Sequence, residues 1–139
     1  DIPEFKDKEK KIKIIAGNFQ NKLGPAKGYV DPIYLDIELE KNKNFIYTIP
    51  SSHNAFIYLV SGEIKIGNKT HNKLENSTLI SLKNGDELKI SATDKSKFLV
   101  IAGKPIGEPI ARGGPFVMNT KQEILKAVQD YHSGNFVQK

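Results

Sequence analysis

Hydrophobic and polar residues alternate along most of the first hundred residues, a pattern typical of β-strands with one buried face. In the clearest case, residues 33–39, four isoleucine or leucine residues alternate with Tyr34, Asp36 and Glu38. Residues 55–60 are instead apolar almost throughout, as expected for a strand that is covered on both sides. Such runs predict roughly eight short strands, near residues 12–15, 33–39, 45–49, 55–60, 63–66, 78–82, 87–91 and 98–102.

Turn residues, and not helices, separate these runs. Gly62, the Gly67-Asn68 pair and the Asn84-Gly85 pair all lie between predicted strands. Short strands joined by turns predict an all-β fold, an antiparallel jelly-roll β-barrel or sandwich. The longer loop at 17–30 is either a plain connection or a flap over one mouth of the barrel.

The last twenty residues follow a helical period. Thr120, with Glu123 three residues later, forms a capping box at a helix N-terminus. The apolar positions that follow recur at helical spacing: Ile124, Leu125, Val128 and Tyr131. We predict one amphipathic helix from 121 to about 132, whose apolar side must be buried against something. The chain is therefore divided into a barrel at 1–119, including a closing connector at 102–119, and a helix with a tail at 120–139.

Composition excludes several classes of protein. The net charge of +5 comes from 20 lysines and one arginine, Arg112, and the lysines are interleaved with acidic residues. Specific nucleic-acid binding is not expected, because arginine is the residue that reads base edges. No apolar run approaches the ~18 residues that a membrane span requires, so no membrane partner is expected. The absence of cysteine fits a cytoplasmic protein, or a nuclear one in a eukaryote.

Residue types that support catalysis or metal binding are scarce. The three histidines, His53, His71 and His132, are far apart in the sequence, and a metal site needs ligands that converge on one point. No nucleophile motif and no phosphate-binding loop is present. We predict no catalytic, cofactor or metal residue in this chain. His53 is interpreted as a solvated loop residue, with a binding role at the barrel mouth as the alternative.

A Gly/Pro-rich segment at 102–120 precedes the helix. It contains the one arginine, Arg112, which Glu108 could pair with. One interpretation is a tight connector locked by that ion pair and by a buried Phe116. The other is a contact surface for a second domain or a partner. The predicted contact residues are Glu108, Arg112, Phe116, Met118, Asn119, Ile124, Leu125, Val128 and Tyr131.

The run GEPIARGGPFVMNT, followed by KQEILKAVQDYHSGNF, resembles the closing segment of the pirin family of two-domain cupins. The resemblance is strongest at 100–136, and moderate at 54–67 and 15–19. It implies a bicupin whose N-terminal domain holds a mononuclear iron and whose C-terminal domain, the part matched here, lacks ligands. In the family the connector and last helix run along the N-terminal barrel. Members are associated with dioxygenase action on flavonols such as quercetin, and in eukaryotes with redox-sensitive transcriptional regulation.

The resemblance also allows a residue-by-residue comparison with the cupin metal site. Cupins use a His-x-His pair, then a glutamate, then a turn glycine, which resembles Gly62 here. The glutamate position is then Ala55, and the His pair falls within 48–51, where there is no histidine. The second motif would add a histidine between 86 and 103, and none is present. A metal-free cupin is predicted, with iron implied only for the N-terminal domain.

Three functions remain as hypotheses. The first is a structural half that docks on the N-terminal cupin domain of the same protein. The second is the non-catalytic half of an iron-dependent dioxygenase, closing its substrate cavity. The third is a transcriptional co-regulator module. The chain begins at Asp1 and its one methionine is Met118, so we expect a piece of a longer protein. A homodimer is the alternative partner.

Overall fold

The structure is a computed structural model that describes residues 1–67, 73–74, 78–82 and 85–137. The chain forms two compact units, Asp1–Pro105 and Ile106–Lys139. The predicted connector at 102–119 is thus shared between them, with its first four residues in unit 1 and the rest in unit 2. The two units are described separately.

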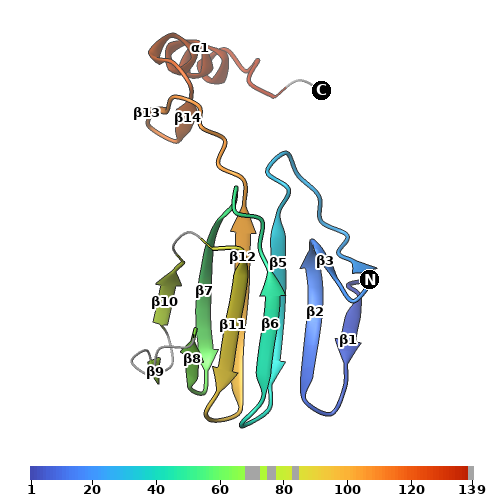
Figure 1. Cartoon of the computed structure of the whole chain (residues 1–139). Helices are drawn as coiled ribbons and strands as arrows, with labels where there is room; N and C mark the ends of the chain where they lie inside the picture. The colour runs from blue at the N-terminus through green and yellow to red at the C-terminus, as the bar shows by residue number, and fades with distance from the viewer. Residues whose placement is uncertain (68–72, 75–77, 83–84, 138–139) are drawn as a thin grey trace. The chain divides into compact units, whose positions relative to one another are not determined.

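Unit 1 is built from two antiparallel sheets that face each other (Figure 1). The larger sheet has the order β1-β2-β5-β12-β7-β10, with bounds Glu4–Lys6, Lys10–Ala16, Ile33–Leu39, Ser96–Gly103, Asn54–Ser61 and Thr78–Ser81. The smaller sheet has the order β6-β11-β8-β9, with bounds Asn44–Thr48, Glu87–Ala92, Ile64–Ile66 and Lys73–Leu74. A short hairpin of β3 (Asn18–Phe19) and β4 (Lys22–Leu23) lies within the loop predicted at 17–30. The predicted all-β antiparallel architecture is confirmed.

The hydrophobic core lies between the two sheets. Alternation in the sequence becomes alternation in burial, because successive side chains of a strand point to opposite faces: every second residue of β5 and of β12 is buried. Phe45 of the smaller sheet and Phe98 of the larger one meet edge to face, with ring centroids 6.0 Å apart. The largest fully buried side chains are Phe45, Phe98, Ile12, Ile14, Leu35, Ile37, Leu39, Ile57, Leu59, Ile64, Ile90 and Val100.

Strand β7 departs from the expectation that both of its faces are covered. Ile57 and Leu59 are fully buried in the core, whereas Phe56, Tyr58 and Val60 are 37%, 38% and 40% exposed. Within the described part of this chain, one face of β7 is therefore covered and the other faces solvent.

Unit 2 contains a hairpin and the predicted helix. The hairpin, β13 (Ala111–Gly113) paired with β14 (Phe116–Met118), lies in the segment predicted to be the closing connector. Helix α1 spans Lys121–His132 and begins with the predicted capping box. The helix packs on the hairpin at Gly113, where a Cβ atom would lie 2.4 Å from Cγ2 of Ile124. The hairpin therefore covers part of the apolar side of the helix, which the sequence predicts to be buried. Leu125 and Tyr131 remain 70% and 64% exposed.

The capping box gives unit 2 a pH-dependent element. Glu123 accepts hydrogen bonds from the Thr120 hydroxyl and from the backbone N–H groups of Thr120 and Asn119, at 3.0, 2.7 and 3.0 Å. These bonds, with the Thr120 hydroxyl as the largest cause, hold the pKa of Glu123 below its ordinary 4.5. A carboxylate with a lowered folded-state pKa stabilises the fold above its unfolded pKa, and this stabilisation disappears as pH falls through the folded pKa.

We therefore expect hydrogen-exchange protection at the start of α1 to be greater at neutral pH than in acid, below the ordinary pKa of 4.5. The matched control is Glu123→Gln, which can still accept the bonds but does not titrate, so its protection should not change with pH. Equal protection factors for the wild-type Asn119 and Thr120 amides in acid and at neutral pH would contradict the assignment.

Candidate functional site

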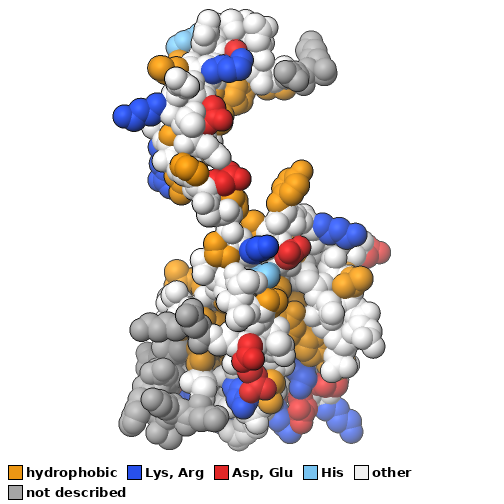
Figure 2. Space-filling model, turned by 45° about the horizontal axis from the view of Figure 1, so that its top comes forward, with side chains coloured by type: hydrophobic (Ala, Val, Ile, Leu, Met, Phe, Trp, Pro, Cys, Tyr) orange, Lys and Arg blue, Asp and Glu red, His pale blue; other side chains and the backbone are white. Residues whose placement is uncertain are grey.

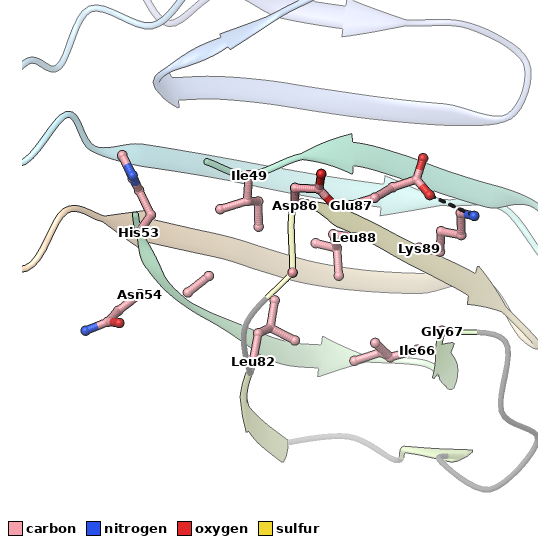
Figure 3. A pocket seen from close by; sticks show the side chains of 12 residues that line it. Ile49, His53, Asn54, Ile66, Gly67, Leu82, Asp86, Glu87, Leu88 and Lys89 are labelled. Carbon is pink, nitrogen blue, oxygen red and sulfur yellow. Dashed lines mark ion pairs between the residues drawn. The ribbon is translucent and has the colours of Figure 1, made fainter. Parts of the chain in front are cut away.

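A pocket of about 380 Å³ lies at one end of the β-sandwich in unit 1 (Figure 3). We call it the mouth pocket. Its apolar side chains come from both sheets and lie on its inner side, and its polar side chains lie on its rim. It is lined by Ile49, His53, Asn54, Ala55, Ile66, Gly67, Leu82, Gly85, Asp86, Glu87, Leu88 and Lys89.

The mouth pocket contains two of the positions that the cupin resemblance assigns to metal ligands, Ile49 and Ala55, and both hold apolar side chains. Ala55 stands at the glutamate position and pairs with Ala102 of β12. Ile49 lies where the histidine pair would fall and is 4% exposed. Gly62 takes the turn role, with a φ of +85° between β7 and β8. Methyl and butyl groups cannot ligate iron, so these residues do not fit the metal.

Elsewhere in the described residues, no group of three or more histidine, aspartate or glutamate side chains lies close enough together to hold an ion. His71 falls outside the described residues. The absence of metal from this chain stays a prediction.

His53 is held by hydrogen bonds at both ring nitrogens. Nε2 lies 2.9 Å from the carbonyl oxygen of Asp31, and Nδ1 lies 3.2 Å from the hydroxyl of Ser52. A carbonyl oxygen only accepts, so Nε2 carries the hydrogen and Nδ1 accepts from Ser52 in the neutral ring. His53 therefore ties the loop before β5 to the turn that begins at Pro50, whose carbonyl accepts from the His53 backbone N–H at 2.9 Å. This geometry favours a structural role over the alternative of ligand binding.

The charged groups on the rim are exposed or paired with each other. Glu87 and Lys89 form an ion pair of 2.7 Å on the outer side of β11 (Figure 3). The backbone carbonyl of Asp86 accepts from the Ile49 N–H at 2.9 Å, which fixes the turn before β11. These residues therefore shape the rim of the mouth pocket and do not form a catalytic pair.

The predicted pairing of Glu108 with Arg112 is wrong for the described residues. Glu108 accepts a hydrogen bond of 2.6 Å from the side-chain amide of Asn119, and Arg112 is exposed on β13. The physical reason is the hairpin: β13 and β14 run antiparallel, which brings Asn119, just after β14, back toward the residues that precede β13. Of the two interpretations of the sequence, the connector locked by an ion pair considers only contacts within the segment, and it does not include this hairpin.

The other predicted contact residues of unit 2 are divided between its interior and its surface. Phe116 is half-buried and packs against the rings of Tyr131 and Phe136, with centroid distances of 6.1 and 5.1 Å. Met118, Ile124 and Val128 are also half-buried. Their burial inside unit 2 accounts for part of the apolar pattern without a partner.

Unit 2 also exposes apolar side chains that the sequence analysis missed. Ile106, Ile110 and Val117 are 70%, 72% and 62% exposed, and they join Leu125 on the surface. The sequence feature that could have indicated these residues is the repeated Pro-Ile pair of the segment KPIGEPI, at 104–110. Several exposed large apolar side chains in one small unit make it a candidate for an interaction surface.

Charge is mixed over the surface of unit 1. On the face drawn in Figure 2, blue lysine and red acidic side chains lie beside each other along the lower edge of the sandwich. Ion pairs such as Lys43–Glu9 at 2.9 Å and Lys95–Glu40 at 2.7 Å join them. Interspersed charge of this kind does not form the basic stripe of a nucleic-acid-binding protein.

Comparison with known proteins gives a consistent result. The model of the pirin C-terminal cupin domain matches residues 34–137. A pirin-like protein of Solanum lycopersicum is 34% identical over 136 residues, covering 96% of this chain and 47% of the relative. Pirin-1 of Arabidopsis thaliana is 32% identical over 137 residues, covering 96% and 48%. The crystal structure of quercetin 2,3-dioxygenase from Acinetobacter baumannii superposes with a TM-score of 0.84 at 32% identity, covering 98% of this chain and 48% of that one.

The chain spans about half the length of the curated relatives it matches. In the part of the chain that the structure describes, no helix is both long and apolar enough to cross a membrane.

Proposed function

The chain belongs to the pirin family as a C-terminal cupin domain, and on that premise we propose that it is the metal-free half of a two-cupin protein and serves to dock on the other half. Its jelly-roll barrel supplies a rigid frame, and its exposed apolar side chains supply the contact. The iron that the family resemblance implies would be held by the other half.

The observation that carries this proposal is the chemistry of the mouth pocket. Ala55 and Ile49 stand where metal ligands would be required, and His53 uses both ring nitrogens within the fold. A barrel without a ligand set cannot position iron for oxygen chemistry. The apolar surface of unit 2, with Ile106, Ile110 and Leu125 at or above 70% exposed, supports the docking part of the proposal.

A second candidate function follows from the name of the superposed Acinetobacter baumannii protein, quercetin 2,3-dioxygenase. In that case this chain is the non-catalytic half of an iron-dependent dioxygenase and closes the substrate cavity. No residue of this chain would then touch the iron.

Both candidates are tested by mixing this chain with a separately produced fragment, the part of the Acinetobacter baumannii protein that the chain does not cover. We call this fragment the partner half, and circular dichroism should first establish that it is folded. We expect micromolar or tighter binding in calorimetry, and no quercetin oxidation by this chain alone with ferrous iron. Oxidation by this chain alone would contradict both candidates. Oxidation that is faster in the mixture than with the partner half alone would favour the second.

A further inference from the structure

Strand β6, Asn44–Thr48, forms one edge of the smaller sheet (Figure 1). It pairs with β11 on one side, and no strand among the described residues pairs with its other side. An unpaired edge presents a row of backbone N–H and C=O groups to which another strand can add. The free side of β6 is therefore a potential site for strand pairing.

The hydrogen bonds to β11 identify the backbone groups of β6 that remain available. At one end the Ile49 N–H donates to the carbonyl of Asp86 at 2.9 Å, and at the other end the Ala92 N–H donates to the carbonyl of Lys43 at 3.0 Å. Alternate residues of an antiparallel strand bond to the same partner, so the odd-numbered residues bond to β11. In the described part of the chain, no backbone hydrogen bond outside the sheet ladders reaches the even-numbered residues, whose N–H and C=O groups point away from β11: Asn44, Ile46 and Thr48.

The sequence of β6 does not protect this edge. Edge strands in natural proteins are usually blunted by lysine, by other charged side chains or by proline. The sequence of β6 is NFIYT, which contains neither a charge nor a proline and is rich in residues that favour strands. Asn44, Ile46 and Thr48 are all exposed, and Ile46 is 56% exposed. The edge is therefore both open and apolar at its centre.

Strand β1, at one edge of the larger sheet, is blunted in the usual way. It carries two charged residues, Glu4 and Lys6. The Nζ atom of Lys22 donates to the backbone carbonyl of Glu4 at 2.6 Å, so an acceptor of this strand is already occupied. The contrast between the two edges indicates that β6 is the one suited to pairing with another strand.

Inward-pointing side chains hold β6 in a fixed position. The ring of Phe19 stacks on the rings of Phe45 and Tyr47, with centroid distances of 6.0 and 6.3 Å. The Tyr47 hydroxyl donates to the carbonyl of Asn18 at 2.9 Å. Because the strand is already ordered in the single chain, pairing through its edge costs little conformational entropy.

We propose that β6 pairs with β6 of a second copy of this chain, antiparallel and across a two-fold axis at Ile46. Ile46 then faces its own counterpart, and Asn44 of each copy faces Thr48 of the other. This register pairs all five residues of the strand and joins the two smaller sheets into one. The argument for this occupant is self-complementarity: an isologous contact joins two identical uncharged edges and leaves neither of them open. The inference does not rest on the proposed docking function.

Single-cysteine variants test the register, because the sequence contains no cysteine. Opposed Cα atoms in a hydrogen-bonded antiparallel pair lie about 5.5 Å apart, within reach of a disulfide. Asn44→Cys and Thr48→Cys serve as controls, because each would lie about 14 Å from its own counterpart. Under a fixed oxidant, we expect Ile46→Cys to form the linked dimer at least about tenfold faster than either control alone. The two controls, when mixed, should link to each other.

A second pair of variants tests the pairing without a disulfide. Ile46→Pro removes the N–H that points away from β11, and proline is tolerated at such a position of an edge strand. Ile46→Val is the matched control, because it keeps the N–H and a branched apolar side chain. In sedimentation velocity we expect wild type to dimerise with a dissociation constant on the order of 100 µM, as for a small interface. Ile46→Val should stay within about twofold, whereas Ile46→Pro should weaken dimerisation at least about tenfold, because two hydrogen bonds across the axis are lost.

The results that would overturn the inference are distinct from those that test docking. Wild type that remains monomeric at about 1 mM, tenfold above the expected dissociation constant, overturns it, and binding of the partner half would still support the docking function. Dimerisation that Ile46→Pro leaves unchanged places the contact elsewhere and also overturns it. Equal linking rates for the three single-cysteine variants have the same consequence. If circular dichroism shows that Ile46→Pro does not fold, the cysteine series decides.

Discussion

Replacing Phe98 by alanine is expected to lower the free energy of unfolding of unit 1 by about 3–5 kcal/mol. Phe98 is fully buried in β12, a central strand of the larger sheet, and its ring packs against Phe45 of the smaller sheet. The substitution therefore removes a contact between the layers and leaves a cavity that neighbouring strands cannot fill. Urea unfolding followed by circular dichroism measures the change.

The matched control is Phe56→Ala. Phe56 is the same residue type on the neighbouring strand, but it is 37% exposed on the outer face. Its truncation removes less buried area and leaves no closed cavity, so we expect a loss of about 1 kcal/mol. Equal losses at the two positions would contradict the placement of the core between the sheets.

Replacing Gly62 by alanine is expected to destabilise unit 1 by roughly 2–4 kcal/mol. This loss is the sum of two costs, the strain of alanine in the left-handed backbone region and the overpacking of the site. Gly62 has a φ of +85°, and a Cβ atom there would lie 2.3 Å from the carbonyl oxygen of Lys95 and 2.4 Å from the hydroxyl of Ser96. That hydroxyl is not free to move, because it accepts from the Glu63 N–H at 2.9 Å and lies 2.7 Å from the carbonyl of Asp94.

Gly67→Ala separates the two causes. Gly67 also has a positive φ, +72°, but among the described residues no atom lies within 4 Å of its added Cβ atom. We expect only the backbone contribution there, about 1–2 kcal/mol. Thermal unfolding of the two variants should show the larger loss for Gly62→Ala, and the reverse order would contradict the close approach of the turn to β12.

The elements that could be predicted from the sequence are those whose structure is caused by a pattern within the same short segment. Alternation of apolar residues at 33–39 yields a strand with one buried face. The capping box at Thr120 and Glu123 begins a helix because it satisfies backbone groups within a few residues. Both signals are complete within the segment, so they could be interpreted without the rest of the fold.

The elements that were missed depend on contacts distant in sequence or on very short strands. The hairpin of β13 and β14 has three residues in each strand, too few for alternation to be visible among glycines and prolines. The hydrogen bond between Asn119 and Glu108 depends on that hairpin, which is why the predicted pairing of Glu108 with Arg112 is wrong. The short strand β1, Glu4–Lys6, pairs with β2 and had no pattern of its own.

The candidate site also has features that could be predicted from the sequence and features that could not. The prediction that metal ligands are missing needed only the residue types at Ala55 and at 48–51, the positions that the cupin resemblance assigns to ligands. The hydrogen bonds of His53 could not be predicted, since they depend on how the loop at Asp31 returns to the turn after β6. The exposed face of β7 was also hidden, because the apolar run at 55–60 indicates coverage on both faces, whereas Phe56, Tyr58 and Val60 are exposed in the described chain.

We propose that this barrel holds no transition metal, and the iron content of the purified chain is the decisive measurement. The chain is incubated with ferrous iron without oxygen, desalted and analysed by inductively coupled plasma mass spectrometry. Because Ala55 and Ile49 of the mouth pocket offer no ligand atoms, we expect less than about 0.1 iron per chain. Retention of about one iron per chain, lost on His53→Ala, would contradict it.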